Sequence, residues 1–288
     1  MRILLAVVAL AACSPNDRDN PAADGPSQPD TPSPDGPNPA ENSRVYAHDG
    51  RVTNGGGAAT PSALYLLNAA TLATTKIGMM PELDTQSLTD LAIDKNDNMF
   101  GITFNKLFSI NPQTAAATLI GPMDIDNATS LSFVPEDVND PNSADMLVTA
   151  SSFGDVVRID PLTGTTSPLG NYGMVNGMQI VSSGDLVGIQ GLGIFATVDV
   201  GQADGDDFLA RIDPVTWKAT PIGLGTGFNK IFGLGFWGGV IYGFVDLGAG
   251  NGGQMIQIDQ NTGVGTLLNS SPIRWFGAGV ATDAPILL

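Results

Sequence analysis

The chain has 288 residues, 42% of them hydrophobic, and its 29 acidic against 12 basic residues give a formal charge of −17. Such a surface repels nucleic acid and anionic membrane surfaces, so we expect no nucleic-acid partner. The acidity is compatible with divalent cations and equally with solubility alone. The single cysteine excludes an intrachain disulfide. The single histidine, His48, would have to serve any histidine-dependent nucleophilic triad, and it cannot by itself form a metal site with several histidines.

The N-terminus has the features of an export signal. Met1-Arg2 gives a positive start, and the apolar run Ile3–Leu10 is too short to span a bilayer as a mature helix. Leu10-Ala11-Ala12-Cys13 follows and resembles the bacterial lipobox, in which cleavage precedes a cysteine that is then acylated. The resemblance implies a signal peptide over residues 1–12 and a membrane anchor at Cys13. An ordinary secretory signal is the alternative.

Residue 14 is serine rather than the aspartate of an inner-membrane retention signal, so we expect the outer membrane rather than the inner one. Residues 13–42 form the next segment, the lipidated cysteine and a tether with eight prolines, six acids and one basic residue. Such a composition offers almost nothing to bury, which predicts a disordered, extended tether.

From residue 43 onward a strand–turn–strand phrase recurs five times. Its clearest form is Val157–Thr166, with an Asp-Pro start and a Thr-Gly exit, in which the Asp side chain is expected to hydrogen-bond its own turn. The apolar residues that precede the turn are spaced by 43, 49, 53 and 46 positions, and they are Leu67, Ile110, Ile159, Ile212 and Ile258. A repeat of 40–50 residues rich in short strands is typical of a β-propeller with one four-stranded sheet per period.

A second anchor alternates with the first and predicts the innermost strand of each sheet. The five segments are 89–93, 130–133, 177–180, 233–236 and 277–280, and the next strand is expected at 99–101, 146–148, 186–188 and 241–243. The chain therefore starts on an outer strand and ends on an inner one. We predict an all-β, five-bladed propeller over residues 43–288, closed by residues 274–281 joining the sheet that residues 44–78 begin.

Glycines are frequent in the predicted inner strands, at positions 177, 233, 235, 277 and 279. A five-bladed ring crowds its axis, where small residues let backbones approach; turns or bulges are the alternative explanation. The repeat resembles bacterial YVTN, NHL and quinoprotein-like propellers over about residues 60–283. That resemblance implies the fold but no particular function, because such families include scaffolds, surface proteins and enzymes.

Long loops are expected on the ligand-binding face of such a ring, between the second and third strands of blades one, four and five. They cover 48–62, 190–206 and 246–253, and blades four, five and one are neighbours. We therefore predict an acidic binding rim. Its residues are Asp49, Arg51, Asn54, Asp199, Asp246 and Asn251.

The acids Asp204, Asp206 and Asp207 suggest a Ca²⁺ site, since this hard ion takes several oxygen ligands. The spacing lacks a helix-loop-helix Ca²⁺ pattern, so a solvated acidic loop is the alternative. A second acidic stretch, 135–145, is expected on the opposite face. His48 is expected to be exposed and without a catalytic partner.

These features favour a monomeric, membrane-anchored surface or periplasmic lipoprotein that binds an envelope protein or glycan through its long-loop face. We expect no catalytic residue and no cofactor other than Ca²⁺. The alternative is a Ca²⁺-assisted hydrolase or lactonase with a carboxylate site at the propeller axis. Several carboxylates converging in the central channel would favour the hydrolase, and an apolar, glycine-lined channel would favour the binding protein.

Overall fold

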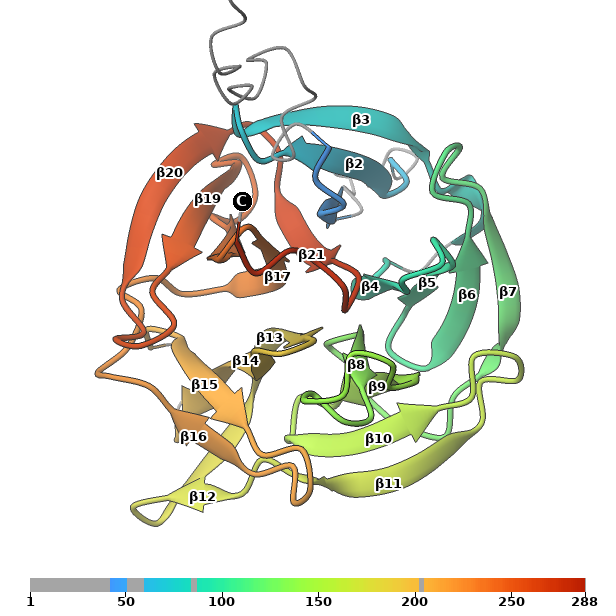
Figure 1. The fold of residues 1–288 in the computed structure, drawn as a ribbon. Coiled ribbons are helices and arrows are strands. Elements are labelled where there is room, and N and C mark those ends of the chain that lie inside the picture. The colour runs from blue at the N-terminus through green and yellow to red at the C-terminus, as the bar shows by residue number, and fades with distance from the viewer. Residues whose placement is uncertain (1–41, 51–59, 84–86, 202–204, 288) are drawn as a thin grey trace, which may run out of the picture. The chain divides into compact units, whose positions relative to one another are not determined.

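The computed structural model describes residues 42–50, 60–83, 87–201 and 205–287. Five antiparallel sheets stand around a common axis in this part of the chain (Figure 1), which confirms the five-bladed propeller. The signal segment 1–12 and nearly all of the tether lie outside the described residues. The described residues contain one 3₁₀ turn, Pro81–Leu83, and no helix long and apolar enough to cross a bilayer.

Each blade is a four-stranded sheet with one strand nearest the axis, and blade 4 has one strand more. Blade 1 comprises β21 (Trp275–Gly279), β1 (Tyr46–Asp49), β2 (Ala63–Asn68) and β3 (Ala73–Met79). Blade 2 comprises β4 (Asp90–Ile93), β5 (Met99–Ile102), β6 (Lys106–Ile110) and β7 (Ala117–Pro122). Blade 3 comprises β8 (Ser132–Pro135), β9 (Asp145–Ala150), β10 (Asp155–Ile159) and β11 (Thr166–Asn171).

Blade 4 comprises β12 (Met174–Val175), β13 (Met178–Ile189), β14 (Gly193–Val200), β15 (Phe208–Ile212) and β16 (Ala219–Pro221). Blade 5 comprises β17 (Ile231–Trp237), β18 (Val240–Asp246), β19 (Gly253–Ile258) and β20 (Gly265–Ser271). We call the side that carries the connections between blades and those between second and third strands the loop face. The opposite side, with the repeated Asp-Pro turns, is the turn face.

The ring closes as predicted, with the last strand of the chain completing the first blade. β21 pairs antiparallel with β1, Ala278 lying opposite Ala47. The Trp275 side chain, 1% exposed, packs edge-on against Tyr65 of its own blade and Phe244 of blade 5, at centroid distances of 5.4 and 5.5 Å. Closure therefore removes free inner edges and buries a large aromatic side chain between the first and last blades.

The repeated turns have the predicted local cause. In each, a side-chain oxygen of the first Asp or Asn accepts backbone N–H groups two or three residues later, as Asp213 does from Val215 and Thr216 at 3.0 and 2.7 Å. The fifth residue has a positive φ in all five turns, and the five are Leu72, Ala115, Gly164, Trp217 and Gly263. Glycine occupies this left-handed position in only two of the turns. In the other three, the turn is stabilised by the hydrogen bonds to the Asp or Asn side chain and by the hydrogen bond from the N–H of the fifth residue to the carbonyl oxygen of the first.

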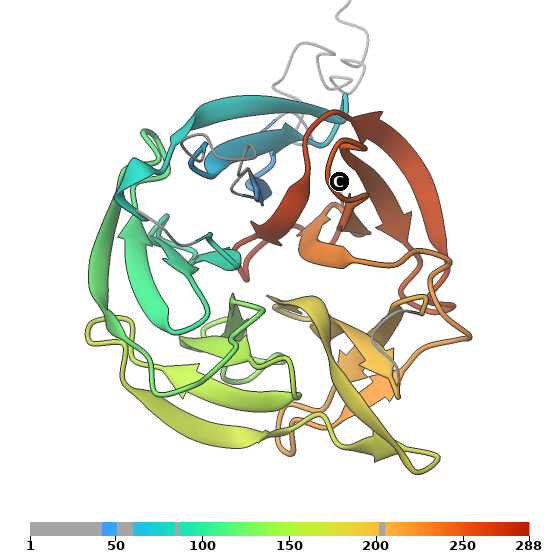
Figure 2. The same ribbon diagram turned by 180° about the vertical axis from the view of Figure 1, so that it is seen from behind.

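Blade 4 corrects our strand assignment. The segment 186–188, predicted as the second strand, belongs to the inner strand β13, whereas residues 193–200, predicted as part of a long loop, form the second strand β14. The segment 177–180 instead opens a hairpin with β12 that projects from the ring (Figures 1 and 2). The error arose because β13 is 12 residues long and holds an irregularity between Ser182 and Leu186, so it contains both apolar runs.

Inner-strand glycines other than Gly177 permit close packing at the axis. A Cβ at Gly279 would lie 2.6 Å from the Leu91 carbonyl oxygen, and a Cβ at Gly233 would lie 2.7 Å from the Ala278 nitrogen. Neighbouring inner strands therefore approach to a distance that no larger residue allows. Gly177 lies in the β12–β13 hairpin with a φ of 78° and open space around it, so its role is conformational.

Candidate functional site

Two aspartates meet at the centre of the ring. They occupy equivalent positions on inner strands, directly before Leu91 in blade 2 and Leu186 in blade 4. Both side chains, those of Asp90 and Asp185, are 0% exposed. The corresponding residues of blades 3, 5 and 1 are small, so the two longer carboxyl groups fill the axis; these residues are Ser130, Gly233 and Gly277.

The carboxyl oxygens accept one backbone N–H from every blade. Asp90 accepts from Leu91 at 2.8 Å and from Leu131 at 2.6 Å. Asp185 accepts from Leu186 and Leu234, both at 2.6 Å, and from the backbone N–H of Ala278. The pair therefore ties all five inner strands together and satisfies N–H groups that the crowded axis would otherwise bury without a partner.

The two carboxyl groups also hydrogen-bond each other, which requires a proton on one of them. Burial raises the pKa of Asp185 to about 8, although the hydrogen bonds that it accepts oppose the shift. Burial, followed by the charge of Asp185, raises the pKa of Asp90 well above its usual range. At neutral pH the pair therefore holds at least one proton, as expected of two carboxyl groups packed together.

A hollow of about 380 Å³ lies at the axis on the loop face, directly above the carboxyl pair. All five blades contribute to it, through connections or inner-strand starts. Among the residues that the structure describes, nine line the hollow, none of them ionisable and three of them phenylalanines; they are Ser87, Leu88, Thr89, Phe104, Thr129, Ser183, Gly184, Phe232 and Phe276. The channel is therefore neither a carboxylate site nor simply glycine-lined: it has an aromatic mouth over a sealed pair of acids.

The predicted rim residues are only partly brought together. Asp49 and Asn251 line one hollow of about 770 Å³ between blades 5 and 1, on the loop face. Asp246 lies behind it, 5% exposed, and accepts two hydrogen bonds from the Arg274 guanidinium at 2.9 and 2.7 Å. Asp199 lies inside blade 4 on β14 and is 5% exposed, so it is not a loop residue. Arg51 and Asn54 lie outside the described residues.

The acids proposed for Ca²⁺ do not share one environment where the structure describes them. Asp206 is exposed, whereas Asp207 is fully buried and accepts the Ile231 N–H at 2.7 Å. Asp204 lies outside the described residues. Over the described ranges, no three His, Cys, Asp or Glu side chains are grouped as metal ligands would be.

His48 is not exposed, contrary to our expectation. It lies on β1 opposite Gly277, is 0% exposed, and its Nδ1 lies 3.1 Å from the Asp49 carbonyl oxygen. Burial lowers the pKa of His48 to about 4, so the ring is neutral at physiological pH. A Cβ on Gly277 would overlap both the His48 ring and the Asp90 carboxyl, which places this histidine beside the axial pair rather than at the surface.

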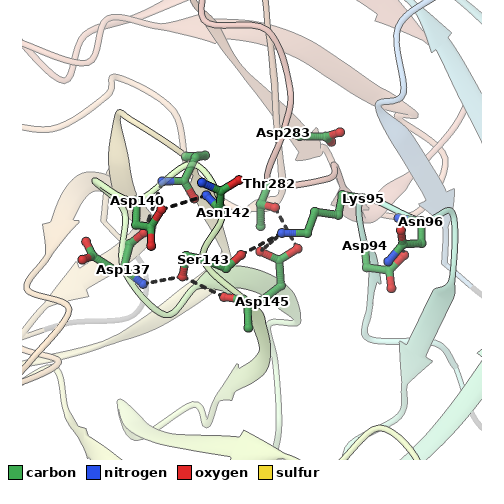
Figure 3. Close-up of polar contacts among 12 residues, drawn as sticks. Asp94, Lys95, Asn96, Asp137, Asp140, Asn142, Ser143, Asp145, Thr282 and Asp283 are labelled. Atoms are coloured by element: carbon green, nitrogen blue, oxygen red, sulfur yellow. Dashed lines mark hydrogen bonds and ion pairs between the residues drawn. The ribbon is translucent and has the colours of Figure 1, made fainter.

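The acidic stretch 135–145 lies on the turn face, as predicted, and its polar groups are largely satisfied within the protein. Figure 3 shows Lys95 reaching from the neighbouring blade to the Ser143 carbonyl oxygen at 2.8 Å, with its ammonium 3.7 Å from Asp145. The Thr282 hydroxyl donates to the same Asp145 carboxylate at 2.9 Å. These contacts join blades 1, 2 and 3 and give the stretch a structural role.

Comparisons with known proteins give no family. No protein-family model and no curated protein matches the chain. Among solved structures, a chain of a nidogen/laminin complex is 10% identical, covering 81% of this chain and 97% of that one, with a TM-score of 0.46. A symmetrical protein from work on de novo evolutionary emergence is 13% identical (83% and 98% covered, TM-score 0.48), and a putative 6-phosphogluconolactonase from Bacteroides uniformis is 9% identical (81% and 98%, TM-score 0.43).

The features that matter most at the axis were missed from sequence. Asp90 was included in an inner strand without a role, and Asp185 was assigned to a connection. A signal existed in the recurrence of a polar or small residue directly before an apolar one, in the pairs Asp90-Leu91, Ser130-Leu131, Asp185-Leu186, Gly233-Leu234 and Gly277-Ala278. Phe232 and Phe276 share this register, since each directly precedes the small residue of its pair. Phe104 does not: it comes from a short connection, so only the folded ring places it beside the other two.

Proposed function

We propose that this chain is a membrane-anchored binding protein of the bacterial envelope that holds its partner on the loop face, at and around the axial hollow. One observation carries the proposal: all five blades contribute side chains to a single concave, apolar site there. In the repeated turns of the opposite face, in contrast, the Asp side-chain oxygens accept hydrogen bonds from backbone N–H groups of the same turn.

The anchor and location follow from the lipobox-like segment that ends at Cys13. Acylation there would hold the protein on a membrane, with the outer membrane as the expected destination, and the proline-rich tether would separate the propeller from it. The expected partner is an envelope protein or glycan, bound by a monomeric propeller related to the YVTN, NHL and quinoprotein-like repeats. The net charge of −17 disfavours nucleic acid.

Binding is favoured over hydrolysis by the state of the axial acids. A carboxylate that acts on a substrate, or that holds Ca²⁺ for it, has to present oxygen atoms to the site. Asp90 and Asp185 are fully buried, and their oxygens already accept backbone N–H groups from five strands. The pair is thus occupied in holding the ring together.

Site-specific photo-crosslinking in cells tests the proposal. A photoreactive residue at position 104, on the loop face, is expected to capture a partner, whereas one at the 85%-exposed Leu162 of a turn-face repeat is not. Mass spectrometry of the adduct separates protein from glycan. Equal capture at both positions, or none at 104, would contradict binding on the loop face. Loss of the membrane-bound fraction in Cys13→Ser tests the anchor separately.

A further inference from the structure

The axial hollow has the composition of a small-molecule site, and its chemistry narrows the ligand. We propose that this hollow binds a neutral phenol-like molecule, an aromatic ring that carries a hydroxyl group. The proposal rests on the proposed function only because it takes the loop face as the binding face. A volume of about 380 Å³ fits one small ligand.

Three phenylalanine rings favour a ligand with an aromatic ring. Phe232 and Phe276 are half-buried and extend from equivalent positions on adjacent inner strands, with ring centroids 5.7 Å apart and planes inclined by 54°. Phe104 is 55% exposed, so its ring is accessible to a ligand in the hollow. Aromatic rings gain from tilted and edge-on contacts with one another beyond the gain from buried area, so a ring in the hollow has favourable partners.

The Phe276 ring is already held in place. A Cβ at Gly50 would overlap it, so the ring lies directly on the Gly50 backbone. On another side the Arg274 guanidinium carbon lies 5.1 Å from the ring centroid, and that guanidinium is itself fixed by Asp246. A side chain that is ordered before binding loses little conformational entropy when a ligand arrives.

Two threonine hydroxyls select the ligand's hydroxyl. Thr89 donates to the Ile102 carbonyl oxygen at 3.2 Å, and Thr129 has the Ala150 carbonyl oxygen at 3.3 Å and the Ser182 hydroxyl at 3.1 Å. Each threonine has only one proton, and these contacts use it. What each of these two oxygens still offers is a lone pair, so at these positions the hollow accepts hydrogen bonds and favours a ligand with an O–H to donate.

No ionisable group is among the described residues that line the hollow, and this favours a neutral ligand. An anion would lose its hydration in the hollow without a cation among the described lining residues to pair with, and it would approach a protein with a charge of −17. An aromatic ammonium ion is the main competitor, because aromatic rings attract cations. A quaternary ammonium cannot donate to the two threonine oxygens, however, and no carboxylate is among the described lining residues to pair with it.

A four-probe titration tests the proposal on the full chain carrying Cys13→Ser, so that no acyl chain or detergent competes for the probes. The probes are 4-ethylphenol, its O-methyl ether 4-ethylanisole, 4-ethylbenzoate and phenyltrimethylammonium, with dissociation constants measured by ligand-observed NMR. We expect 4-ethylphenol to bind at least fivefold more tightly than the ether and at least tenfold more tightly than either ion.

Variants assign the binding to the hollow. Phe104→Ala should weaken 4-ethylphenol at least fivefold, whereas Phe153→Ala, which removes a ring that is 58% exposed in the equivalent connection of blade 3 but outside the hollow, should leave it unchanged. Thr129→Val should lower the affinity for the phenol to that for the ether and leave the ether unaffected, provided that the melting temperature shows a folded protein.

The proposal is overturned if no probe binds, if an ion binds as tightly as the phenol, or if Phe104→Ala and Phe153→Ala behave alike. These outcomes do not depend on the crosslinking experiment. If position 104 captures an envelope partner while no phenol binds, the proposed binding function stands and the proposed ligand class is wrong. If a phenol binds but no partner is captured, the ligand class stands and the proposed binding of an envelope partner is wrong.

Discussion

Replacing Asp185 by asparagine should remove most of the pH dependence of the propeller's stability. Asparagine keeps the size of the side chain and one accepting oxygen, but its NH₂ group then faces an N–H donor from a neighbouring inner strand. A buried donor left without an acceptor costs about 1–3 kcal/mol. At mildly acidic pH the variant should therefore be less stable than the natural chain.

The natural chain should lose stability as the pH rises. Because burial raises the pKa of Asp185 to about 8, from about 4 in an unfolded chain, the native state holds one proton more than the unfolded state between those values. Its stabilising contribution is complete below about pH 4 and is lost as the pH passes through about 8. The slope is about 1 kcal/mol per pH unit, or roughly 2–4 °C in melting temperature for a domain of this size.

His48 acts in the opposite direction over part of this range. Burial lowers its pKa to about 4, so its contribution is lost as the pH falls from about 6.5 to 4. The two slopes oppose each other below about pH 6.5, and the window from 6.5 to 8 isolates the carboxyl pair. Over that window the natural chain should lose about 2 kcal/mol, and Asp185→Asn should lose much less.

Differential scanning calorimetry at constant ionic strength from pH 5 to 9 measures both slopes. We expect the two melting curves to converge toward pH 8–9, where Asp185 of the natural chain has lost its proton. A melting temperature of the natural chain that is flat or rises between pH 6.5 and 8, or an equal slope in Asp185→Asn, would refute the shared-proton interpretation.

Three further predictions test the surroundings of the axis. The single histidine gives one set of imidazole NMR signals, and their titration midpoint should lie near pH 4; a midpoint near 6.5 would mean that His48 is not buried. Gly277→Ala should destabilise the ring by at least about 1–3 kcal/mol in chemical denaturation, because the added Cβ overlaps Asp90 and His48. Gly205→Ala, where a Cβ meets open space, should leave the free energy of unfolding unchanged. Equal effects of the two substitutions would disprove the crowding argument. Arg274→Lys should lower the free energy of unfolding by about 1–2 kcal/mol, because it loses the two hydrogen bonds to buried Asp246. Arg158→Lys, in the exposed pair with Glu136, should leave that free energy almost unchanged. The difference between the two variants is the quantity to measure.

The fold was predictable because its signals are local. Each repeated turn is set by an Asp or Asn that hydrogen-bonds residues two and three positions onward, and each strand shows its own apolar alternation. The order of these signals along the chain was enough to predict closure by β21. The same reasoning failed in blade 4, where the unusual length of β13 put two apolar runs into one strand.

The candidate site was much less predictable because it is formed by residues distant in the chain. Long connections pointed to the loop face, and two predicted rim residues, Asp49 and Asn251, do line a hollow there. The axial hollow, however, combines a short connection with inner-strand starts from all five blades. A phenylalanine in sequence does not reveal whether it will be buried in a blade or left at the mouth of the ring.

By itself, then, the sequence determined the strands, the turns, the number of blades and the way the ring closes, since these depend on contacts within a few tens of residues or on a repeat that can be counted. Tertiary structure alone decided that Asp90 and Asp185 share a proton and that His48 is neutral. Those properties arise from burial at the axis, where inner strands from every blade approach closely enough to exclude water and to direct their N–H groups at two carboxyl groups.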